Sequence, residues 1–266
     1  MAKAKPSVMV VIPARYGSSR FPGKPLVMLG RKPMIQHVYE HAAACRLVPE
    51  VMVATDDERI KQAVERFGGR VAMVTGDYRT GTDRVAGVAR MFERDYYLNL
   101  QGDEIPLQPY FLTDLIEPCI VGGVAIGTPK SAIDSTENGH HSSGVKGGTD
   151  HLGNALYFSR APIPLVRDDA GRRAVDGLHF IHLGLYMYRR DTLLKFASLP
   201  TGRLEDAEKL EQLRALEYGI PIRVWESAHA SLRVDTPQDV ESAAEKLQSY
   251  DVIEQESGAL KAAPSR

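Results

Sequence analysis

Three basic residues lie close together in residues 13–26, which read Pro-Ala-Arg-Tyr-Gly-Ser-Ser-Arg-Phe-Pro-Gly-Lys-Pro-Leu. They are Arg15, Arg20 and Lys24, and glycine, serine and proline surround them. A backbone rich in glycine and serine can turn its N–H groups toward phosphate oxygens, while guanidinium and ammonium groups neutralise the phosphate charge. The segment is not a Walker A loop, because Pro25 stands where that loop carries a serine or threonine that holds Mg²⁺. It predicts a phosphate-binding loop, and a solvated basic turn is the alternative.

Two acidic residues could bring a metal ion to that phosphate. Asp103 lies in Gln-Gly-Asp-Glu, directly after an expected strand, and Asp235 follows the apolar Val234 and precedes a helix start. Mg²⁺ is usually bound through one or two carboxylates plus phosphate oxygens of the substrate. We therefore expect Asp103 and Asp235 to hold Mg²⁺ opposite the basic loop, with an ordinary Gly-Asp turn as the alternative for Asp103.

The elements of the first half should bring these residues to one edge of a sheet. Short apolar runs predict strands at residues 8–12, 51–54, 71–74 and 96–100. Between them, helical patterns cover residues 34–45, 55–67 and 82–92, and the second begins with a Thr-Asp-Asp-Glu capping box at residues 55–58. This alternation predicts a mostly parallel α/β sheet with helices on both faces and the ligand at the carboxyl ends of the strands.

The second half is less regular. Strands are expected at residues 125–128, 155–159, 184–188 and 222–226, and helices at 204–218 and 237–248. The last helix has Thr236 as its expected cap and Pro237 at its first position. The polar residues 130–143 predict a flexible loop, and we expect poorly ordered tails at residues 1–6 and 254–266.

Composition excludes several classes of function. The chain has 33 lysines and arginines against 34 aspartates and glutamates, so its net charge of −1 does not suit a general nucleic-acid binder. It has two cysteines, no apolar stretch long enough to span a membrane and no recognisable signal peptide, so we expect a cytoplasmic protein. His37, Glu40 and His41 match an H-x-x-E-H metal pattern, but an exposed helix face is the favoured interpretation.

Six segments of the sequence, in order along residues 8–248, resemble the CMP-Kdo synthetase (3-deoxy-manno-octulosonate cytidylyltransferase) family: VVIPARYGSSRFPGKPL, QGDE, ALYFSRAPIP, HLGLYMYR, LEQLRALEYG and VDTPQD. The resemblance implies one nucleotide-diphospho-sugar-transferase domain of Rossmann-like α/β fold over residues 7–250. It also implies a homodimer that transfers CMP from CTP to an acidic sugar such as Kdo, with release of pyrophosphate, as a step of lipopolysaccharide biosynthesis.

The resemblance also assigns roles to individual residues. The expected CTP-binding residues are Arg15, Ser18, Arg20, Lys24, Gln101, Thr82 and Arg84. The expected acceptor-binding residues are Arg160, His182, Tyr186, Glu211 and Gln212. The expected metal ligands are Asp103 and Asp235, and these two acids act in catalysis together with Lys24 and Arg15. Because Mg²⁺ and cationic side chains stabilise the phosphates and the leaving group, no protein nucleophile is required.

The sequence departs from the family pattern mainly around the acceptor. Tyr78-Arg79-Thr80 stands where the family has His-x-Ser, and Ile105 intervenes before Pro106. An additional cation, Arg79 or Arg203, would suit a small phosphonate such as phosphonoformate, so phosphonate cytidylyl transfer is the first alternative. A non-catalytic nucleotide-binding homologue and a nucleotidyltransferase that uses UTP or GTP are the others.

Overall fold

The apolar run after the N-terminus forms the central strand β1 (Val8–Pro13) of a computed structural model that describes residues 5–17, 21–76, 78–108, 110–133, 144–167, 178–228 and 231–249. Successive β1 side chains face opposite sides of the sheet, so that Val10 and Ile12 belong to one hydrophobic core and Met9 and Val11 to the other. A strand buried on both faces explains why the run is continuously apolar instead of alternating.

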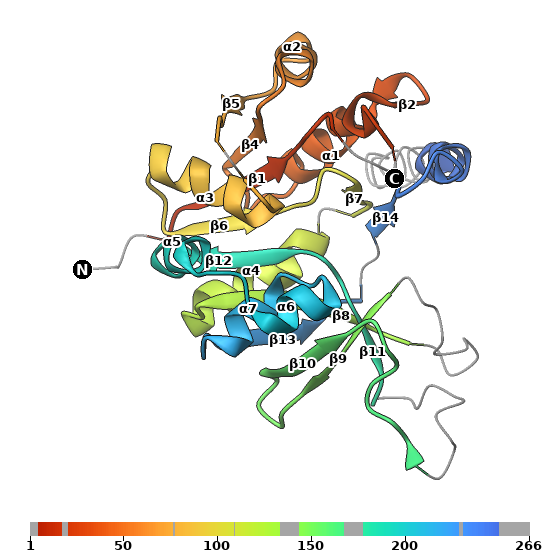
Figure 1. Cartoon of the computed structure of the whole chain (residues 1–266). Coiled ribbons are helices and arrows are strands. Elements are labelled where there is room, and N and C mark those ends of the chain that lie inside the picture. The colour runs from red at the N-terminus through yellow and green to blue at the C-terminus, as the bar shows by residue number, and fades with distance from the viewer. Residues whose placement is uncertain are drawn as a thin grey trace, which may run out of the picture.

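The central sheet has 10 strands in the described residues, in the order β10-β9-β11-β8-β12-β6-β1-β4-β5, with β13 beside β8 (Figure 1). The strands around β1 are β4 (Glu50–Thr55), β5 (Val71–Met73), β6 (Tyr96–Asn99) and β12 (Tyr186–Arg189). The strands beyond β12 are β8 (Ile126–Ala132), β9 (Val145–Thr149), β10 (Ala155–Ser159), β11 (Phe180–His182) and β13 (Ile222–Glu226).

Most strands of this sheet run in the same direction. The pairs β1–β4, β1–β6, β4–β5 and β8–β13 are parallel, whereas β12 is antiparallel to both β6 and β8. Following the pairings through the sheet shows that β10, β11 and β12 run opposite to the remaining strands. The α/β prediction is therefore confirmed, and the antiparallel strands β9, β10 and β11 extend from one end of the sheet (Figure 1).

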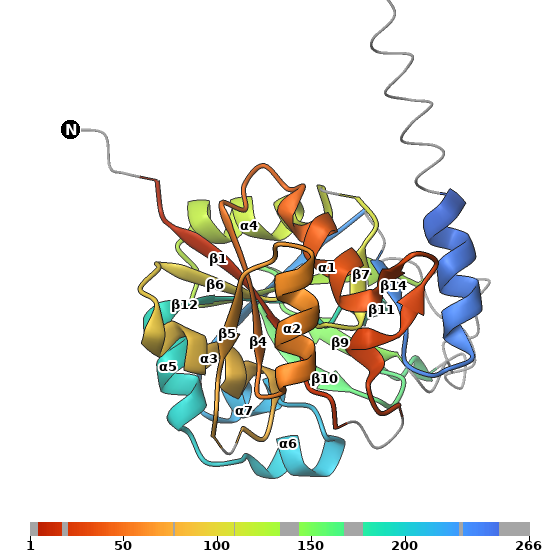
Figure 2. The ribbon, with the colours of Figure 1, turned by 90° about the horizontal axis from the view of Figure 1, so that it is seen from above.

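Helices cover both faces of the sheet, as predicted. The helices are α1 (Met34–Ala43), α2 (Glu58–Arg66), α3 (Gly81–Met91), α4 (Tyr110–Gly122), α5 (Arg190–Ser198), α6 (Arg203–Glu208), α7 (Gln212–Glu217) and helical residues 239–249. Buried side chains of α1, α2, α4 and 239–249 form one core, and those of α3, α5 and α7 form the other. Figure 2 shows α4 on one side of β1, β6 and β12, and α5 and α7 on the other.

Two expected helix starts are wrong. The helix expected from a capping box at Thr55 begins at α2, where Asp57 is the cap and accepts from the Arg59 N–H at 2.9 Å. Thr55 instead ends β4, and its hydroxyl accepts from the Asp57 N–H. The last helix begins at residue 239, because the Thr236 hydroxyl donates to the Asp239 carboxylate instead of capping the helix.

The second half contains the other differences from prediction. The single helix expected over residues 204–218 is two helices, α6 and α7, because Lys209 adopts a left-handed backbone conformation with φ of 55°. Lys130 to Ala132, expected in a loop, belong to β8, and Gly184 precedes β12. Residues 134–143 of that expected loop, and residues 254–266 of the expected tail, lie outside the described residues.

The structure also contains short elements that the sequence pattern did not predict. They are the 3₁₀ turn η1 (Lys24–Leu26), the hairpin of β2 (Met28–Leu29) and β3 (Lys32–Pro33), and the pair of β7 (Glu104–Pro106) and β14 (Ser231–Arg233). One of them, the β7–β14 pair, joins the two halves. No helix among the described residues is long and apolar enough to cross a membrane.

Candidate active site

The loop after β1 carries the predicted phosphate-binding cations. The Ala14 N–H donates to the Ala54 carbonyl at 2.9 Å, so the sheet continues past β1 and fixes the start of the loop. Gly23 then turns the chain into η1 with φ of 71°, and a side chain there would meet the Tyr16 ring at 3.2 Å. Lys24 follows directly, while Ser18 and Arg20 lie outside the described residues.

Lys24 lies between the two predicted metal ligands. Its Nζ is 2.5 Å from Asp103 Oδ2 and 3.7 Å from Asp235 Oδ1, and it also donates to the Val234 carbonyl at 3.1 Å. Arg233 holds the other Asp235 oxygen at 2.8 Å. Both aspartates thus approach the same ammonium group of the basic loop, and their role as metal ligands stays a prediction.

The pairing of β7 with β14 explains how two aspartates 132 positions apart (235 minus 103) meet. Arg233 is in register with Glu104, and the Val234 N–H donates to the Asp103 carbonyl at 3.1 Å. Glu104 is buried, and burial raises the pKa of its carboxyl, which accepts from the Ser231 hydroxyl at 2.6 Å. The Glu104–Ser231 hydrogen bond thus holds β14 in the position that carries Asp235 to Asp103.

Two adjoining cavities share Pro13, Ala14, Arg15 and Gln101 in their linings. One has about 150 Å³ and is lined also by Lys24 and Asp103. The other has about 140 Å³ and extends toward Gly81 and Arg84. They lie at the carboxyl ends of β1 and β6, the edge where an α/β sheet binds its ligand. This edge brings together Arg15, Lys24, Gln101, Asp103 and Arg84 of the predicted site.

Arg84 presents an unpaired donor to this edge. Its Nη2 is 3.1 Å from Asp56 Oδ2, and its guanidinium carbon lies 5.6 Å from the centre of the Tyr78 ring. Its Nη1 is buried and has no hydrogen-bond partner among the residues that the structure describes. A buried guanidinium N–H without a partner is costly, so a ligand acceptor such as a nucleotide oxygen would stabilise it.

Thr82 lies behind the cavity instead of on its surface. The side chain is fully buried, accepts from Asn99 Nδ2 at 3.0 Å and donates to Glu211 Oε1 at 2.7 Å. The Thr82 hydroxyl is thus engaged by Asn99 and Glu211, so a contact of Thr82 with CTP, which stays a prediction, would have to come from its main chain. Burial raises the pKa of the Glu211 carboxyl, and the hydrogen bond from Thr82 opposes that rise.

His182 and Tyr186 lie next to one another, with ring centres 5.2 Å apart. The Thr128 hydroxyl donates to the Leu185 carbonyl at 2.7 Å, so His182 Nε2, 2.9 Å from the same hydroxyl, must be the donor. Burial lowers the pKa of His182 to about 3. The imidazole is therefore neutral near pH 7, with Nδ1 as its acceptor, and it cannot serve as a cation for an anionic ligand.

Arg160 and Gln212 complete the expected acceptor residues. Arg160 follows β10, and its main-chain N–H and Nε donate to Glu208, while the buried Lys146 donates to its carbonyl at 2.6 Å. Gln212 is the buried first residue of α7, directly after Glu211. β12 begins at Tyr186, which lies beside His182 and close enough to Glu211 to feel its charge. Arg160 is instead held at the end of α6 by Glu208.

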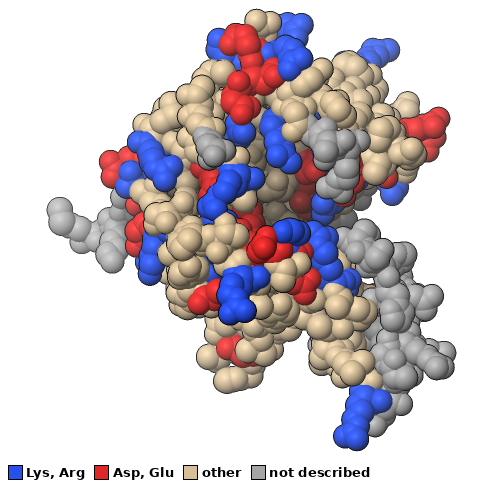
Figure 3. All heavy atoms as spheres, in the orientation of Figure 1, with Lys and Arg blue, Asp and Glu red and all other residues tan. Residues whose placement is uncertain are grey.

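Sequence reasoning missed the residues that position these groups. Asn99 contacts two of the expected site residues, and Thr128 and Arg233 contact one each. None of the three matches a chemical motif. The one available signal was the polar alternation of Asn99 and Gln101 at the end of an apolar strand. Basic and acidic side chains are interspersed over the face that Figure 3 shows.

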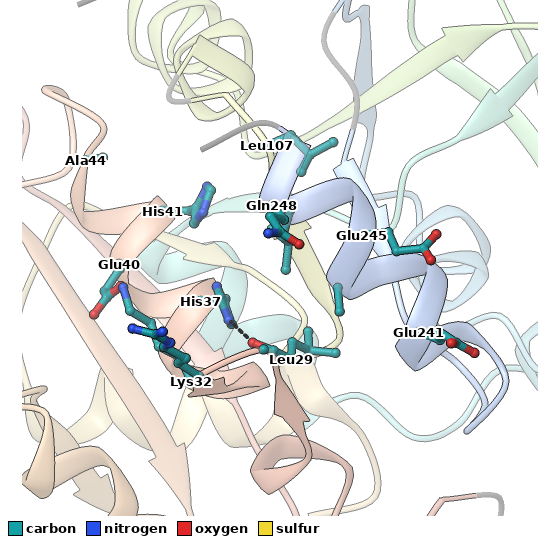
Figure 4. A pocket seen from close by; sticks show the side chains of 14 residues that line it. Leu29, Lys32, His37, Glu40, His41, Ala44, Leu107, Glu241, Glu245 and Gln248 are labelled. Atoms are coloured by element: carbon teal, nitrogen blue, oxygen red, sulfur yellow. Dashed lines mark hydrogen bonds and ion pairs between the residues drawn. The ribbon is translucent and has the colours of Figure 1, made fainter. Parts of the chain in front are cut away.

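A separate cavity of about 770 Å³ lies between α1, the β2–β3 hairpin and residues 239–249 (Figure 4). It contains the H-x-x-E-H residues, which are partly buried and not on the exposed face that was expected. His37 Nε2 lies 2.9 Å from the Leu29 carbonyl, and His41 Nδ1 lies 2.8 Å from that of Pro106. Because a carbonyl oxygen can only accept, each histidine donates a hydrogen bond to the main chain here. Among the described residues no group of three or more His, Cys, Asp or Glu side chains could hold a metal ion.

Comparisons with known proteins identify the family of this chain. A cytidylyltransferase family model matches residues 9–224. The 3-deoxy-manno-octulosonate cytidylyltransferase of Geobacter sulfurreducens is 50% identical over 248 residues, which cover 91% of this chain and 99% of that protein. The corresponding protein of Geobacter metallireducens is 48% identical over 252 residues, covering 92% of this chain and 99% of that one.

Solved structures give the same result. A CMP:2-keto-3-deoxy-manno-octonic acid synthetase complexed with CTP matches with a TM-score of 0.84 and 43% identity, covering 91% of this chain and 99% of that chain. A putative glucose-1-phosphate thymidylyltransferase from Bacillus anthracis, at 15% identity and a TM-score of 0.64, covers 91% of this chain and 96% of its own and supports the fold alone. This chain therefore belongs to the 3-deoxy-manno-octulosonate cytidylyltransferase family.

Proposed function

We propose that this protein transfers the cytidylyl group of CTP to 3-deoxy-manno-octulosonate and releases pyrophosphate. The observation that carries the proposal is the arrangement of Lys24 between Asp103 and Asp235, beside Arg15, in a chain 50% identical to a relative of that name. The relatives named above support this acceptor over the phosphonate considered from the sequence. The phosphonate alternative relied on Arg79 or Arg203 as an additional cation, and Arg79 Nη1 donates a hydrogen bond to Thr201 Oγ1 at 2.5 Å.

We also propose that the enzyme uses Mg²⁺. Asp103 and Asp235 both approach the Lys24 ammonium, so the site is already arranged around positive charge. Two carboxylates are the number that Mg²⁺ commonly takes from a protein when phosphate oxygens supply further ligands. These residues therefore fit the ion, which when bound would neutralise negative charge on the phosphates.

In the proposed reaction, the anomeric hydroxyl oxygen of the acceptor attacks the α-phosphorus of CTP in line. The new P–O bond forms as the bond to the β-phosphate oxygen breaks, pyrophosphate leaves, and the hydroxyl proton passes to solvent. Lys24 and Arg15 would stabilise the charge on the phosphoryl oxygens and the leaving group, because cations fixed before the reaction need no reorganisation. Arg160, as the exposed cation of the acceptor set, would bind the sugar carboxylate.

A homodimer and a cytoplasmic location remain part of the proposal, and both rest on the resemblance to the family. The dimer is tested by light scattering on the purified protein, where a single peak at twice the 29.3 kDa chain mass is expected. A peak at the chain mass over the concentrations used for activity would contradict the dimer without affecting the proposed chemistry.

The decisive experiment measures pyrophosphate release with CTP and 3-deoxy-manno-octulosonate at varied Mg²⁺, and identifies the product by its mass. Release is expected with CTP and not with UTP or GTP at equal concentration. Binding of CTP with no turnover would support the non-catalytic alternative instead. Turnover with UTP or GTP but not CTP would contradict the proposed donor.

A further inference from the structure

Asn99 is a polar residue in a fully buried part of the sheet. It ends β6 and is completely inaccessible to solvent, and the neighbouring side chains Tyr97, Leu98 and Leu100 are equally buried. Its register partners are Val11 on β1 and Tyr186 on β12, so it lies at the centre of the sheet. A buried amide costs free energy unless its donor and acceptor are both partnered, and an apolar residue would be the ordinary occupant of this position.

Both ends of the Asn99 amide are partnered by expected site residues. Gln101 Nε2 donates to Asn99 Oδ1 at 3.1 Å, and Asn99 Nδ2 donates to Thr82 Oγ1 at 3.0 Å. Thr82 then donates to Glu211 Oε1 at 2.7 Å. The four side chains form a continuous chain of hydrogen bonds from Gln101, which lines both candidate nucleotide cavities, to Glu211, which we expect at the acceptor.

The chain of hydrogen bonds has one direction. With Glu211 ionised, Thr82 gives its single hydroxyl proton to that carboxylate and therefore accepts from Asn99. This requirement fixes the Asn99 amide with its oxygen toward Gln101, and that oxygen in turn holds one N–H of the Gln101 amide. The orientation of Gln101 at the cavity and the position of Glu211 are therefore set by the same buried residue.

We propose, on the basis of the function proposed above, that Asn99 is a positioning residue of the transfer reaction. It holds Gln101 at the nucleotide and, through Thr82, holds Glu211 at the acceptor. The nucleotide-binding and acceptor-binding side chains therefore keep a fixed position relative to one another. Glu211 Oε2 is buried and has no hydrogen bond of normal geometry among the residues described, although Thr80 also lies beside this carboxyl and lowers its pKa.

Substitutions at Thr82 and Asn99 test separately the acceptor end and the nucleotide end of this series of hydrogen bonds. Thr82→Val removes the hydroxyl but leaves the Asn99–Gln101 contact, so the KM for the acceptor should rise about tenfold with the KM for CTP unchanged. Asn99→Leu removes both contacts and should raise both KM values. Thr82→Ser restores the hydroxyl and should return the acceptor KM to within about twofold of wild type.

The double variant Asn99→Leu/Thr82→Val should behave like Asn99→Leu alone, because the chain acts as one unit. Thr192→Val, a buried threonine of α5, is the matched control: it should leave both KM values unchanged. If Asn99→Leu does not fold, the comparison of Thr82→Val with Thr82→Ser still tests the proposed series of hydrogen bonds.

The proposal is overturned if Thr82→Val leaves the acceptor KM unchanged, if Thr82→Ser fails to restore it, or if Thr192→Val changes it equally. All three outcomes require an active wild-type enzyme. A wild-type protein that releases no pyrophosphate would instead contradict the proposed function.

Discussion

The Lys24 ammonium lies 2.5 Å from the Asp103 carboxylate, although 79 positions separate the two residues. The contact joins the loop after β1 to the loop after β6, the two strands that pair in parallel at the centre of the sheet. Gly102 makes it possible, because a side chain at that position would come within 3.0 Å of the Pro13 carbonyl oxygen. The centre of the candidate site is thus built from two neighbouring strand ends.

Replacing Lys24 by methionine, which keeps the length of the side chain but removes its charge, should lower kcat by about 10²- to 10³-fold. This is the usual effect of deleting one group that stabilises transition-state charge. The measurement is pyrophosphate release at saturating CTP and acceptor. Lys61→Met, at an ion-paired lysine on α2, is the control and should retain wild-type kcat. A Lys24→Met enzyme within threefold of wild type would remove Lys24 from the mechanism.

Asp103→Asn and Asp235→Asn should each raise the Mg²⁺ concentration for half-maximal activity by at least about tenfold. Loss of a group that only orients a metal ligand already costs about 10- to 100-fold in affinity, so loss of a ligand should cost no less. A titration of activity with Mg²⁺ at fixed CTP measures the effect. Asp191→Asn, on α5, should leave the titration unchanged, and an identical titration for all three variants would argue against a metal at this pair.

The sequence predicts most strands and helices of the first half, because β1, β4 and β6 are buried on both faces and therefore stand out as continuous apolar runs. It does not predict α4, whose residues Leu112, Leu115, Ile116 and Cys119 are buried among a mainly apolar sequence with Pro118 inside the helix. Nor does it predict the break at Lys209, since lysine rarely adopts a left-handed backbone and nothing in the pattern marks it.

The candidate site, like the fold, contains some residues that the sequence predicts and others that it does not. Lys24, Asp103 and Asp235 could be proposed from local features, namely a basic loop and acids at the ends of apolar strands. The hydrogen bond between Thr82 and Glu211 could not, because it spans 129 positions and depends on how α3 and α7 pack into the same hydrophobic core. Residues that act only by holding others, such as Asn99, leave no chemical motif in a sequence.

Removing the charge of the fully buried Arg214 should destabilise the fold strongly. Its Nη2 pairs with Glu205, its Nη1 lies 3.9 Å from Asp83, and its guanidinium carbon lies 4.7 Å from the Phe196 ring centre. Arg214→Leu leaves the Glu205 carboxylate buried without its partner, so the free energy of unfolding should fall by about 3–5 kcal/mol. Urea denaturation measures the change.

Arg189→Leu is the control for that prediction, because both side chains of the Arg189–Asp191 pair are exposed and an exposed ion pair contributes little to stability. The double variant Arg214→Leu/Glu205→Leu should be less destabilised than Arg214→Leu alone, since no buried charge is then left unpaired. If the two Arg214 variants are equally unstable, packing around the guanidinium, and not its charge, is what stabilises this part of the fold.

The stability of the protein should fall in acid partly because of His182. Its ring is packed against Phe158, Tyr186 and Thr128, and burial, with a smaller effect of Arg233, lowers its pKa from the ordinary 6.5 to about 3. The unfolded chain therefore gains a proton at His182 below about pH 6.5, while the folded chain does not until about pH 3. Each pH unit in that window should cost up to about 1.4 kcal/mol of unfolding free energy.

The test compares urea denaturation of wild type and His182→Gln from pH 7 to pH 4, because glutamine keeps an N–H donor for Thr128 but does not titrate. The difference between their unfolding free energies should change steadily in favour of the variant as the pH falls, whereas His151→Gln, at an exposed histidine, should track wild type. If the unfolding free energies of wild type and His182→Gln change in parallel with pH, the folded protein binds a proton at His182 as readily as the unfolded chain does. The assignment of a buried, neutral imidazole at His182 would then be wrong.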